Sequence, residues 1–321
     1  MNKNNPVTLI LEPENYCEKA IRIFSKYSSV AKFTTNVSDK VIDNNKITNL
    51  VVRLKYHINR SFLQKYPNLK SIVSPTTGLN HIDLKYTKNN NICVISLKNE
   101  TEFLSSVKST SEFTWCLILS LVRGVKEAFI DVENGNWNRN NFPGYILNGK
   151  TLGIVGFGRI GKQLSQIALG FGMKVLVYDI HNSSVSQNMK FVDLPFLLKN
   201  SNIITNNLSY NKSTIEFFDS QKFSQMIKKP YFINTARGEI VDENALICAL
   251  KTGGISGAAL DVIKNEHILN CKSRLHNPLI IYAKSNNNLI ITPHLGGNSP
   301  EDMRKTELFI AKKYEKWITS L

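Results

Sequence analysis

The chain has 321 residues, of which 42% are hydrophobic and 20% charged, which is typical of a globular protein with room for two domains. Its net charge of +15 would permit nucleic acid or an anionic membrane as a partner, but the lysines are scattered, with no dense basic block and no aromatic platform. Because the lysines are scattered, we expect neither partner. No apolar run approaches the roughly 20 residues that span a bilayer.

The cysteines and the N-terminal residues favour a reducing compartment. Cys17, Cys93, Cys116, Cys248 and Cys271 are widely spaced and include no CxxC pair, which indicates free thiols and not a disulfide framework or a metal site. The first apolar run is short and soon followed by acids, as in a core strand and not a signal peptide. A cytoplasmic protein without a bound metal is the expectation.

The first hundred residues alternate between short apolar runs and helix-length stretches. This β/α alternation predicts a parallel sheet. The predicted strands are 7–11, 50–54, 72–73 and 92–95, and the helices or loops between them are 13–27, 37–45 and 59–66.

Two features of this region are candidates for binding an anion. Thr77 and Gly78 lie just after a predicted strand and suit a loop whose backbone N–H groups meet a negative charge, although a plain turn is the alternative. Arg53 and Lys55, near the end of another strand, could face the same ligand or be solvated.

Residues 101–130 carry the longest helical pattern in the chain, with one apolar stripe, and predict a long helix that bridges two domains. Residues 135–149 are loop-like and contain Trp137 and Phe142. Such aromatic side chains either dock on a partner subunit or are buried within the same chain.

The stretch 151–179 contains the most specific local pattern: a buried strand, the sequence GFGRIG, a helix and a second strand that ends at an acid. Gly156 allows a tight turn, Gly158 lets the backbone approach a pyrophosphate, and Gly161 lets the helix pack on the strand. Asp179 would accept hydrogen bonds from a ribose 2′-OH and repel a 2′-phosphate. The pattern predicts a dinucleotide site that prefers NAD to NADP.

The alternation then resumes, with predicted strands at 203–205, 231–233, 257–260 and 289–291 and helices at 193–199, 219–228 and 242–252. Their order fits a doubly wound sheet that begins at Leu152. Residues 264–288 are predicted to be a surface insertion, and 300–321 an amphipathic helix.

Polar side chains follow three of these predicted strands. Arg237, Asp261 and His294 each come just after a strand, and Glu266 follows Asp261 by five residues. Because ligands bind at the carboxyl ends of parallel strands, these side chains should converge beside the dinucleotide. Arg237 would hold a carboxylate, His294 would pass a proton and Glu266 would fix its tautomer, which fits reduction of a 2-oxo acid. Singly, each residue could also be an ordinary ion pair, a solvated acid or a core histidine.

These motifs, in this order, resemble the NAD-dependent D-isomer-specific 2-hydroxyacid dehydrogenases, with phosphoglycerate dehydrogenase-like enzymes as the most similar subgroup. The stretches that carry the resemblance are 77–83, 109–112, 137–150, 156–179, 234–246, 257–262 and 292–297. One departure is His267, which stands where the family usually has proline after the catalytic glutamate.

The resemblance implies a catalytic trio of Arg237, Glu266 and His294. The cofactor-binding residues it implies are Gly156, Gly158, Arg159, Ile160, Gly161, Asp179, Thr235, Ala236, Arg237, Asp261, His294, Gly296 and Gly297. The substrate-binding residues it implies are Arg53, Thr77, Gly78, Arg237 and His294.

The resemblance also implies an α/β fold of two Rossmann-like domains, each a doubly wound parallel sheet, with an interdomain cleft. Residues 1–104 plus 293–321 would form a flavodoxin-like substrate domain, and 105–292 an NAD-binding domain that pairs into a homodimer. Two alternatives are a hydroxypyruvate or glyoxylate reductase, and a non-catalytic NAD(H)-sensing protein similar to a transcriptional corepressor.

Overall fold

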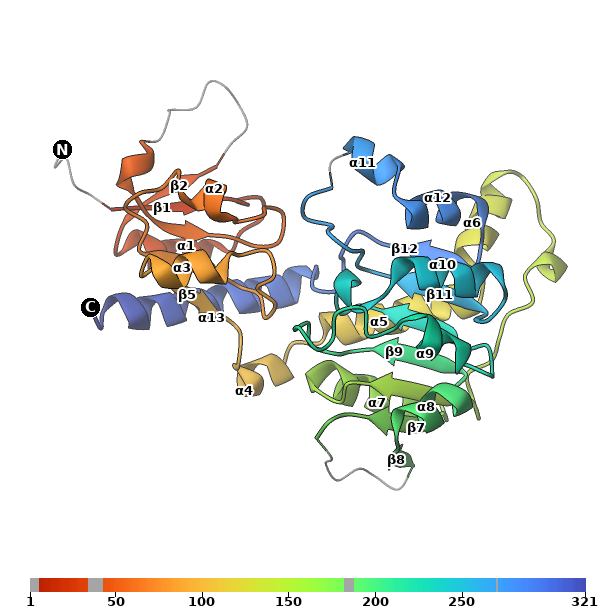
Figure 1. Ribbon diagram of the computed structural model, residues 1–321. Coiled ribbons are helices and arrows are strands. Elements are labelled where there is room, and N and C mark those ends of the chain that lie inside the picture. The colour runs from red at the N-terminus through yellow and green to blue at the C-terminus, as the bar shows by residue number, and fades with distance from the viewer. Residues whose placement is uncertain (1–5, 34–42, 182–187, 270) are drawn as a thin grey trace. The chain divides into compact units, whose positions relative to one another are not determined.

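The computed structural model describes residues 6–33, 43–181, 188–269 and 271–321. The chain divides into two compact units (Figure 1). The first comprises Met1–Ser106 and Ser299–Leu321, and the second comprises Val107–Asn298. Each unit is a parallel sheet with helices, so the predicted α/β class is confirmed. The assignment of substrate binding to the first unit stays a prediction.

The first unit contains a five-stranded sheet in the order β2-β1-β3-β4-β5, the flavodoxin-like strand order. Its elements are β1 (Val7–Ile10), α1 (Glu18–Ser25), β2 (Ser29–Lys32), β3 (Ile47–Val51), α2 (Arg60–Leu63), β4 (Ser71–Ser74), α3 (Leu84–Asn89), β5 (Cys93–Ser96), α4 (Thr101–Ser105) and α13 (Pro300–Ile318). β2 was not predicted, because this edge strand has no continuous apolar run and no fully buried residue. Most of the element predicted at 37–45 lies outside the described residues.

A buried ion pair ties α13 to the rest of the first unit. The Glu307 side chain, only 1% exposed, accepts hydrogen bonds at Oε1 from Arg53 Nε, 2.9 Å away, and from Arg53 Nη2. Its other oxygen accepts from the Cys17 backbone N–H at 2.7 Å. Arg53 Nη1 also donates to the Glu14 carbonyl at 3.1 Å, and its guanidinium lies over the Tyr16 ring. Arg53 is therefore engaged within its own unit, and its predicted role in substrate binding stays a prediction.

Replacing Arg53 with methionine is expected to destabilise the protein by about 3–5 kcal/mol, because Glu307 would be left buried without its cation. The measurement is the free energy of unfolding in urea. The matched control is Arg22→Met, which removes a solvent-exposed pair with Glu18 and should cost less than about 1 kcal/mol. Equal costs for the two variants would contradict the structural importance of the buried pair.

The second unit contains a seven-stranded sheet, all parallel, in the order β12-β11-β10-β9-β6-β7-β8. The chain order reverses between β6 and β9, the point at which ligands bind in open α/β sheets. Its elements are α5 (Ser109–Val122), α6 (Val125–Glu133), β6 (Thr151–Val155), α7 (Arg159–Gly170), β7 (Lys174–Tyr178), β8 (Met189–Phe191), α8 (Leu194–Asn200), β9 (Ile203–Asn206), α9 (Ser220–Ser224), β10 (Tyr231–Asn234), α10 (Glu243–Lys251), β11 (Gly257–Leu260), α11 (Cys271–Leu275), α12 (Pro278–Ser285) and β12 (Leu289–Ile291).

Alternate residues of these strands supply two hydrophobic cores, one on each face of the sheet. Ile154 packs with α5 and α7, whereas its neighbour Val155 packs with α8, α10 and α12. This division follows from the two-residue repeat of a strand, whose successive side chains point to opposite faces. Both faces are covered by helices, as expected of a parallel sheet.

Two predictions about local structure were wrong. Residues 101–130 form three helices and not one, because the chain leaves the helical path at Ser106–Lys108 and again at Gly124, which has a left-handed φ of 57°. The stretch 264–288 is not only surface structure, since α12 covers the sheet and Leu279 is fully buried.

Among the described residues, none of the helices combines the length and apolar character needed to cross a bilayer.

Candidate functional site

The glycine-rich loop between β6 and α7 leaves room for a ligand. Gly156 has a left-handed φ of 94°, and a Cβ there would lie 2.7 Å from the backbone of Asn207. A Cβ at Gly161 would overlap the Gly156 carbonyl, so both positions need glycine for the fold itself. At Gly158, by contrast, no described atom other than those of its chain neighbours lies within 4 Å of the position that a Cβ would occupy. This open space beside the loop fits the approach of a pyrophosphate.

The start of α7 presents groups of the kind that suit phosphate binding. Gly158 is the N-cap of this 12-residue helix and brings no side chain to the helix start, where the positive end of the helix dipole favours an anion. Arg159 donates a hydrogen bond from Nη1 to the Val107 carbonyl at 2.9 Å, and Ile160 packs beside the core. The helix start is thereby fixed to the beginning of α5.

Asp179, at the end of β7, reaches back to the same loop. One carboxylate oxygen accepts a hydrogen bond from the Phe157 N–H at 2.6 Å, and the other accepts from the His181 N–H at 2.9 Å. The side chain is half-exposed, and each oxygen retains a lone pair for a further donor. The position is thus compatible with binding a ribose hydroxyl, and the loop as a whole fits NAD.

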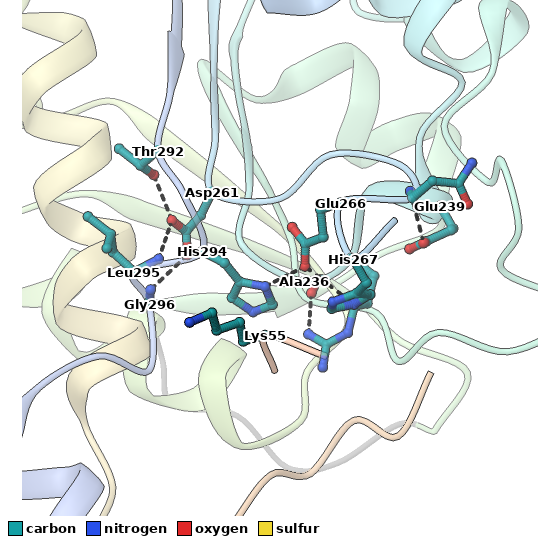
Figure 2. Close-up of polar contacts among 12 residues, drawn as sticks. Lys55, Ala236, Glu239, Asp261, Glu266, His267, Thr292, His294, Leu295 and Gly296 are labelled. Atoms are coloured by element: carbon teal, nitrogen blue, oxygen red, sulfur yellow. Dashed lines mark hydrogen bonds and ion pairs between the residues drawn. The ribbon is translucent and has the colours of Figure 1, made fainter. Parts of the chain in front are cut away.

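A second group of side chains lies after β10, β11 and β12, whose carboxyl ends share one edge of the sheet. His294 Nδ1 and Glu266 Oε1 are 2.5 Å apart (Figure 2). Since an ionised carboxylate can only accept, Nδ1 carries the proton and Nε2 is directed away from Glu266. His294 has a left-handed φ of 57°, an uncommon conformation for a residue other than glycine.

Asp261 organises the turn that holds His294. Its buried carboxylate accepts hydrogen bonds from Thr292 Oγ1 at 2.6 Å and from the backbone N–H groups of Leu295 and Gly296, both at 2.7 Å (Figure 2). The Asp261 carbonyl accepts from the His294 N–H at 2.8 Å. Burial raises the pKa of the Asp261 carboxyl above its usual value, although these hydrogen bonds oppose the shift.

Arg237 follows β10 and is held by an amide network. The Asn234 side chain donates to the Arg237 carbonyl at 3.0 Å and accepts from the Ala236 N–H at 3.1 Å. Arg237 Nη1 donates to the Ala236 carbonyl at 2.6 Å. Burial lowers the pKa of the Arg237 guanidinium, and the nearby Glu266 and Glu239 oppose that shift. An arginine nevertheless stays charged at neutral pH.

Three residues that shape this site were not among those predicted. A Cβ at Gly238 would overlap the backbone of Ile263, so this glycine lets the Arg237 loop pack directly on the Glu266 loop. At the start of α5, Ser109 Oγ donates to the Gly296 carbonyl at 3.0 Å, and the hydroxyls of Thr114 and Thr235 are 2.8 Å apart. The glycine after Arg237 could have signalled the close approach, but nothing in the local pattern indicated the two hydroxyl contacts.

The glycines after His294 differ from one another. A Cβ at Gly296 would lie 3.1 Å from Asp261 Oδ2, a tight contact, whereas at Gly297 no described atom comes within 4 Å. In the first unit, Thr77 is exposed in the loop after β4, and Thr76 Oγ1 donates to the Gly78 carbonyl at 3.0 Å. The role predicted for Thr77 and Gly78 in substrate binding stays a prediction.

Comparison with known proteins gives a consistent result. A family model described as the NAD binding domain of D-isomer specific 2-hydroxyacid dehydrogenases matches residues 115–296. D-3-phosphoglycerate dehydrogenase 2 of Saccharomyces cerevisiae is 32% identical over 96% of this chain and 66% of its own length. Glyoxylate reductase of Thermococcus litoralis is 33% identical over 82% of this chain and 78% of its own length.

Among solved structures, D-lactate dehydrogenase of Aquifex aeolicus with NAD and lactic acid superposes with a TM-score of 0.81 and 30% identity, over 98% of this chain and 96% of that one. The chain spans 66% of the yeast relative and 57% of D-3-phosphoglycerate dehydrogenase of Methanocaldococcus jannaschii, so it covers less than two thirds of these two proteins. It belongs to the D-isomer-specific 2-hydroxyacid dehydrogenase family, and the residues matched by the NAD binding domain model lie within its second unit.

Proposed function

We propose that this protein is an NAD-dependent D-2-hydroxyacid dehydrogenase that interconverts a 2-oxo acid and a D-2-hydroxy acid by hydride transfer. The observation that carries the proposal is the 2.5 Å hydrogen bond between Glu266 and His294. This pair lies at the same edge of the sheet as Arg237 and the Gly156–Gly161 loop. An acid–base pair, a cation and a dinucleotide loop are the parts that this reaction requires.

In the proposed mechanism, the Arg237 guanidinium holds the substrate carboxylate through two parallel hydrogen bonds and polarises the adjacent carbonyl. His294 donates a proton from Nε2 to the carbonyl oxygen during reduction and takes it back during oxidation. Glu266 accepts a hydrogen bond from the other ring nitrogen and so fixes the tautomer and orientation of the imidazole. The Gly156–Gly161 loop and Asp179 would hold NADH, which when bound would supply the hydride to the substrate carbon.

The test is a panel of 2-oxo acids with NADH and with NADPH, followed by absorbance at the nicotinamide band. We expect NADH-dependent reduction of at least one acid among 3-phosphohydroxypyruvate, hydroxypyruvate, glyoxylate and pyruvate. A phosphoglycerate dehydrogenase-like specificity is supported by the yeast relative, and a glyoxylate reductase by the Thermococcus litoralis protein. If NADH binds but no acid is reduced, the NAD(H)-sensing alternative takes the place of the proposed enzyme.

Asp179 is expected to set the preference for NAD. Asp179→Asn keeps an acceptor for the Phe157 N–H but removes the charge that would repel a 2′-phosphate. We expect the ratio of kcat/KM with NADH to that with NADPH to fall at least about tenfold, which corresponds to ~1.4 kcal/mol. Asp179→Ala, which also loses the loop contact, should weaken binding of both cofactors. An unchanged ratio in the asparagine variant would refute this role.

We also propose that the protein forms a homodimer through α6 and the loop that follows it. Phe129, Trp137 and Ile146 are 66%, 89% and 70% exposed, more apolar surface than one segment of a monomer usually presents to water. Light scattering should give twice the chain mass, and Trp137→Glu should shift the protein toward monomer. Ile227→Glu, at an exposed position after α9, is the control and should leave the mass unchanged. A monomeric wild type would reject the proposal.

A further inference from the structure

A second imidazole lies against the carboxylate that orients His294. His267 Nε2 is 3.6 Å from Glu266 Oε1, the oxygen that also accepts from His294 Nδ1. Figure 2 shows the two rings on opposite sides of the Glu266 carboxylate. The His267 side chain is only 8% exposed, so the ring is held beside Glu266 and is not a surface residue that lies there by chance.

The backbone fixes this arrangement. The backbone of Ile263 and Lys264 lies against Gly238. The next residue, Asn265, has a left-handed φ of 59°, and this turn sets the direction in which Glu266 and His267 follow. The Lys264 N–H donates to Glu243 Oε1 at 2.6 Å and anchors the start of the same turn. A proline at position 267, the residue expected from the family resemblance, would carry neither a donor nor a titratable group.

The charges around His267 make its protonation consequential. In the second unit, His267 pairs with Glu266 on its own loop, and Glu266 also interacts with His294 after β12 and Arg237 after β10. Arg237 in turn interacts with Glu239. Burial tends to raise the pKa of Glu266, but the hydrogen bond from His294 and the charges of His294, His267 and Arg237 bring that pKa below its usual value. Glu266 is therefore an anion throughout the neutral range, and a proton that enters this group binds to one of the two imidazoles.

We propose that His267 is a positioning residue that competes with His294 for Glu266 and for a shared proton. When the two imidazoles hold one proton beyond those of their neutral forms, part of the population carries it on His267, and His294 then cannot donate it to substrate. When both rings are charged, their repulsion favours loss of a proton. Both effects lower the pH at which the reductive reaction loses its proton donor. The inference rests on the proposed function, in which His294 is that donor.

The test compares the pH dependence of kcat/KM for 2-oxo acid reduction in the wild type, His267→Gln and His267→Pro. The high-pH decline should move upward by about half to one pH unit in both variants, as expected when a nearby charge that shares Glu266 is removed in a partly solvated site. The control is His276→Gln, which removes an exposed imidazole on the same unit and should leave the profile in place. A lower rate at every pH with no movement of the decline would show a merely structural role and overturn the proposal.

A second readout does not depend on turnover. The ring carbon signal of His294 is followed by NMR against pH in the NADH complex, with the signal assigned by its loss in His294→Gln. We expect the His294 titration in His267→Gln to move upward by the same amount as the activity profile. If no 2-oxo acid is reduced, the proposed enzyme activity fails while the titration still decides the coupling. An identical His294 titration in the wild type and in His267→Gln would overturn the inference.

Discussion

Replacing His294 with glutamine is expected to lower kcat for 2-oxo acid reduction by about 10²–10⁴-fold, the usual contribution of a positioned general acid. Glutamine retains a donor for Glu266 but has no proton to transfer at neutral pH. The dissociation constant for NADH should change little, because the pyrophosphate site at Gly158 is built by a different loop. Steady-state kinetics and NADH fluorescence measure the two quantities separately. A variant within threefold of the wild type in kcat would exclude His294 as the proton donor.

The lowered pKa of Glu266 determines how its ion pair with His294, and hence the reductase activity, should depend on pH. The carboxyl pKa is lower in the folded protein than in a free glutamate, so its ion pair with His294 is present above the ordinary value and is lost only as the pH falls through the lowered one. In the neutral range Glu266 should not titrate. Glu266→Gln should therefore move the high-pH decline of reductase activity to lower pH, because His294 loses the anion that stabilises its charge. No movement of the decline would contradict the pairing.

Arg237→Lys is expected to lower kcat/KM for the 2-oxo acid by about 10³-fold, or ~4 kcal/mol of transition-state stabilisation. Lysine keeps the charge but loses the planar pair of donors that grips a carboxylate. Affinity for NADH should be retained. Because Arg237 also donates to the Ala236 carbonyl, the free energy of unfolding is measured beside the kinetics. If the lysine variant keeps kcat/KM within tenfold of the wild type while folding normally, bidentate binding by Arg237 is excluded.

Most strands of the second unit, and the glycine-rich turn, could be predicted from local patterns in the sequence. The strands near 203, 231, 257 and 289 were predicted because buried parallel strands are short apolar runs, and the glycine spacing after β6 defined the turn. The positions of Arg237, Asp261 and His294 at strand ends followed from the same reasoning. In the structure, the Asp261 carboxylate also accepts hydrogen bonds from the N–H groups of Leu295 and Gly296, which the spacing of the residues did not indicate.

Contacts between distant segments could not be predicted in this way. The Arg53–Glu307 pair joins residues 254 positions apart, and the Asp179–Phe157 hydrogen bond crosses from one strand end to another loop. Neither contact can be predicted from the periodicity of apolar residues, because that periodicity indicates only which face of a single helix or strand is buried. The single helix predicted over 101–130 failed for a related reason. Its apolar stripe continues across Gly124, and only the left-handed φ of that glycine reveals the break.

Direct observation of hydride transfer is the sharpest test of the proposed dehydrogenase reaction. The 2-oxo acid that the protein reduces best is incubated with NADH that carries deuterium at both C4 positions of the nicotinamide, and the product is analysed by mass spectrometry. We predict one deuterium on the former carbonyl carbon, D configuration wherever that carbon is chiral, and loss of the labelled product in Arg237→Lys and His294→Gln. A product without deuterium at that carbon, or no reduction of any acid by the NADH-bound protein, would contradict the account.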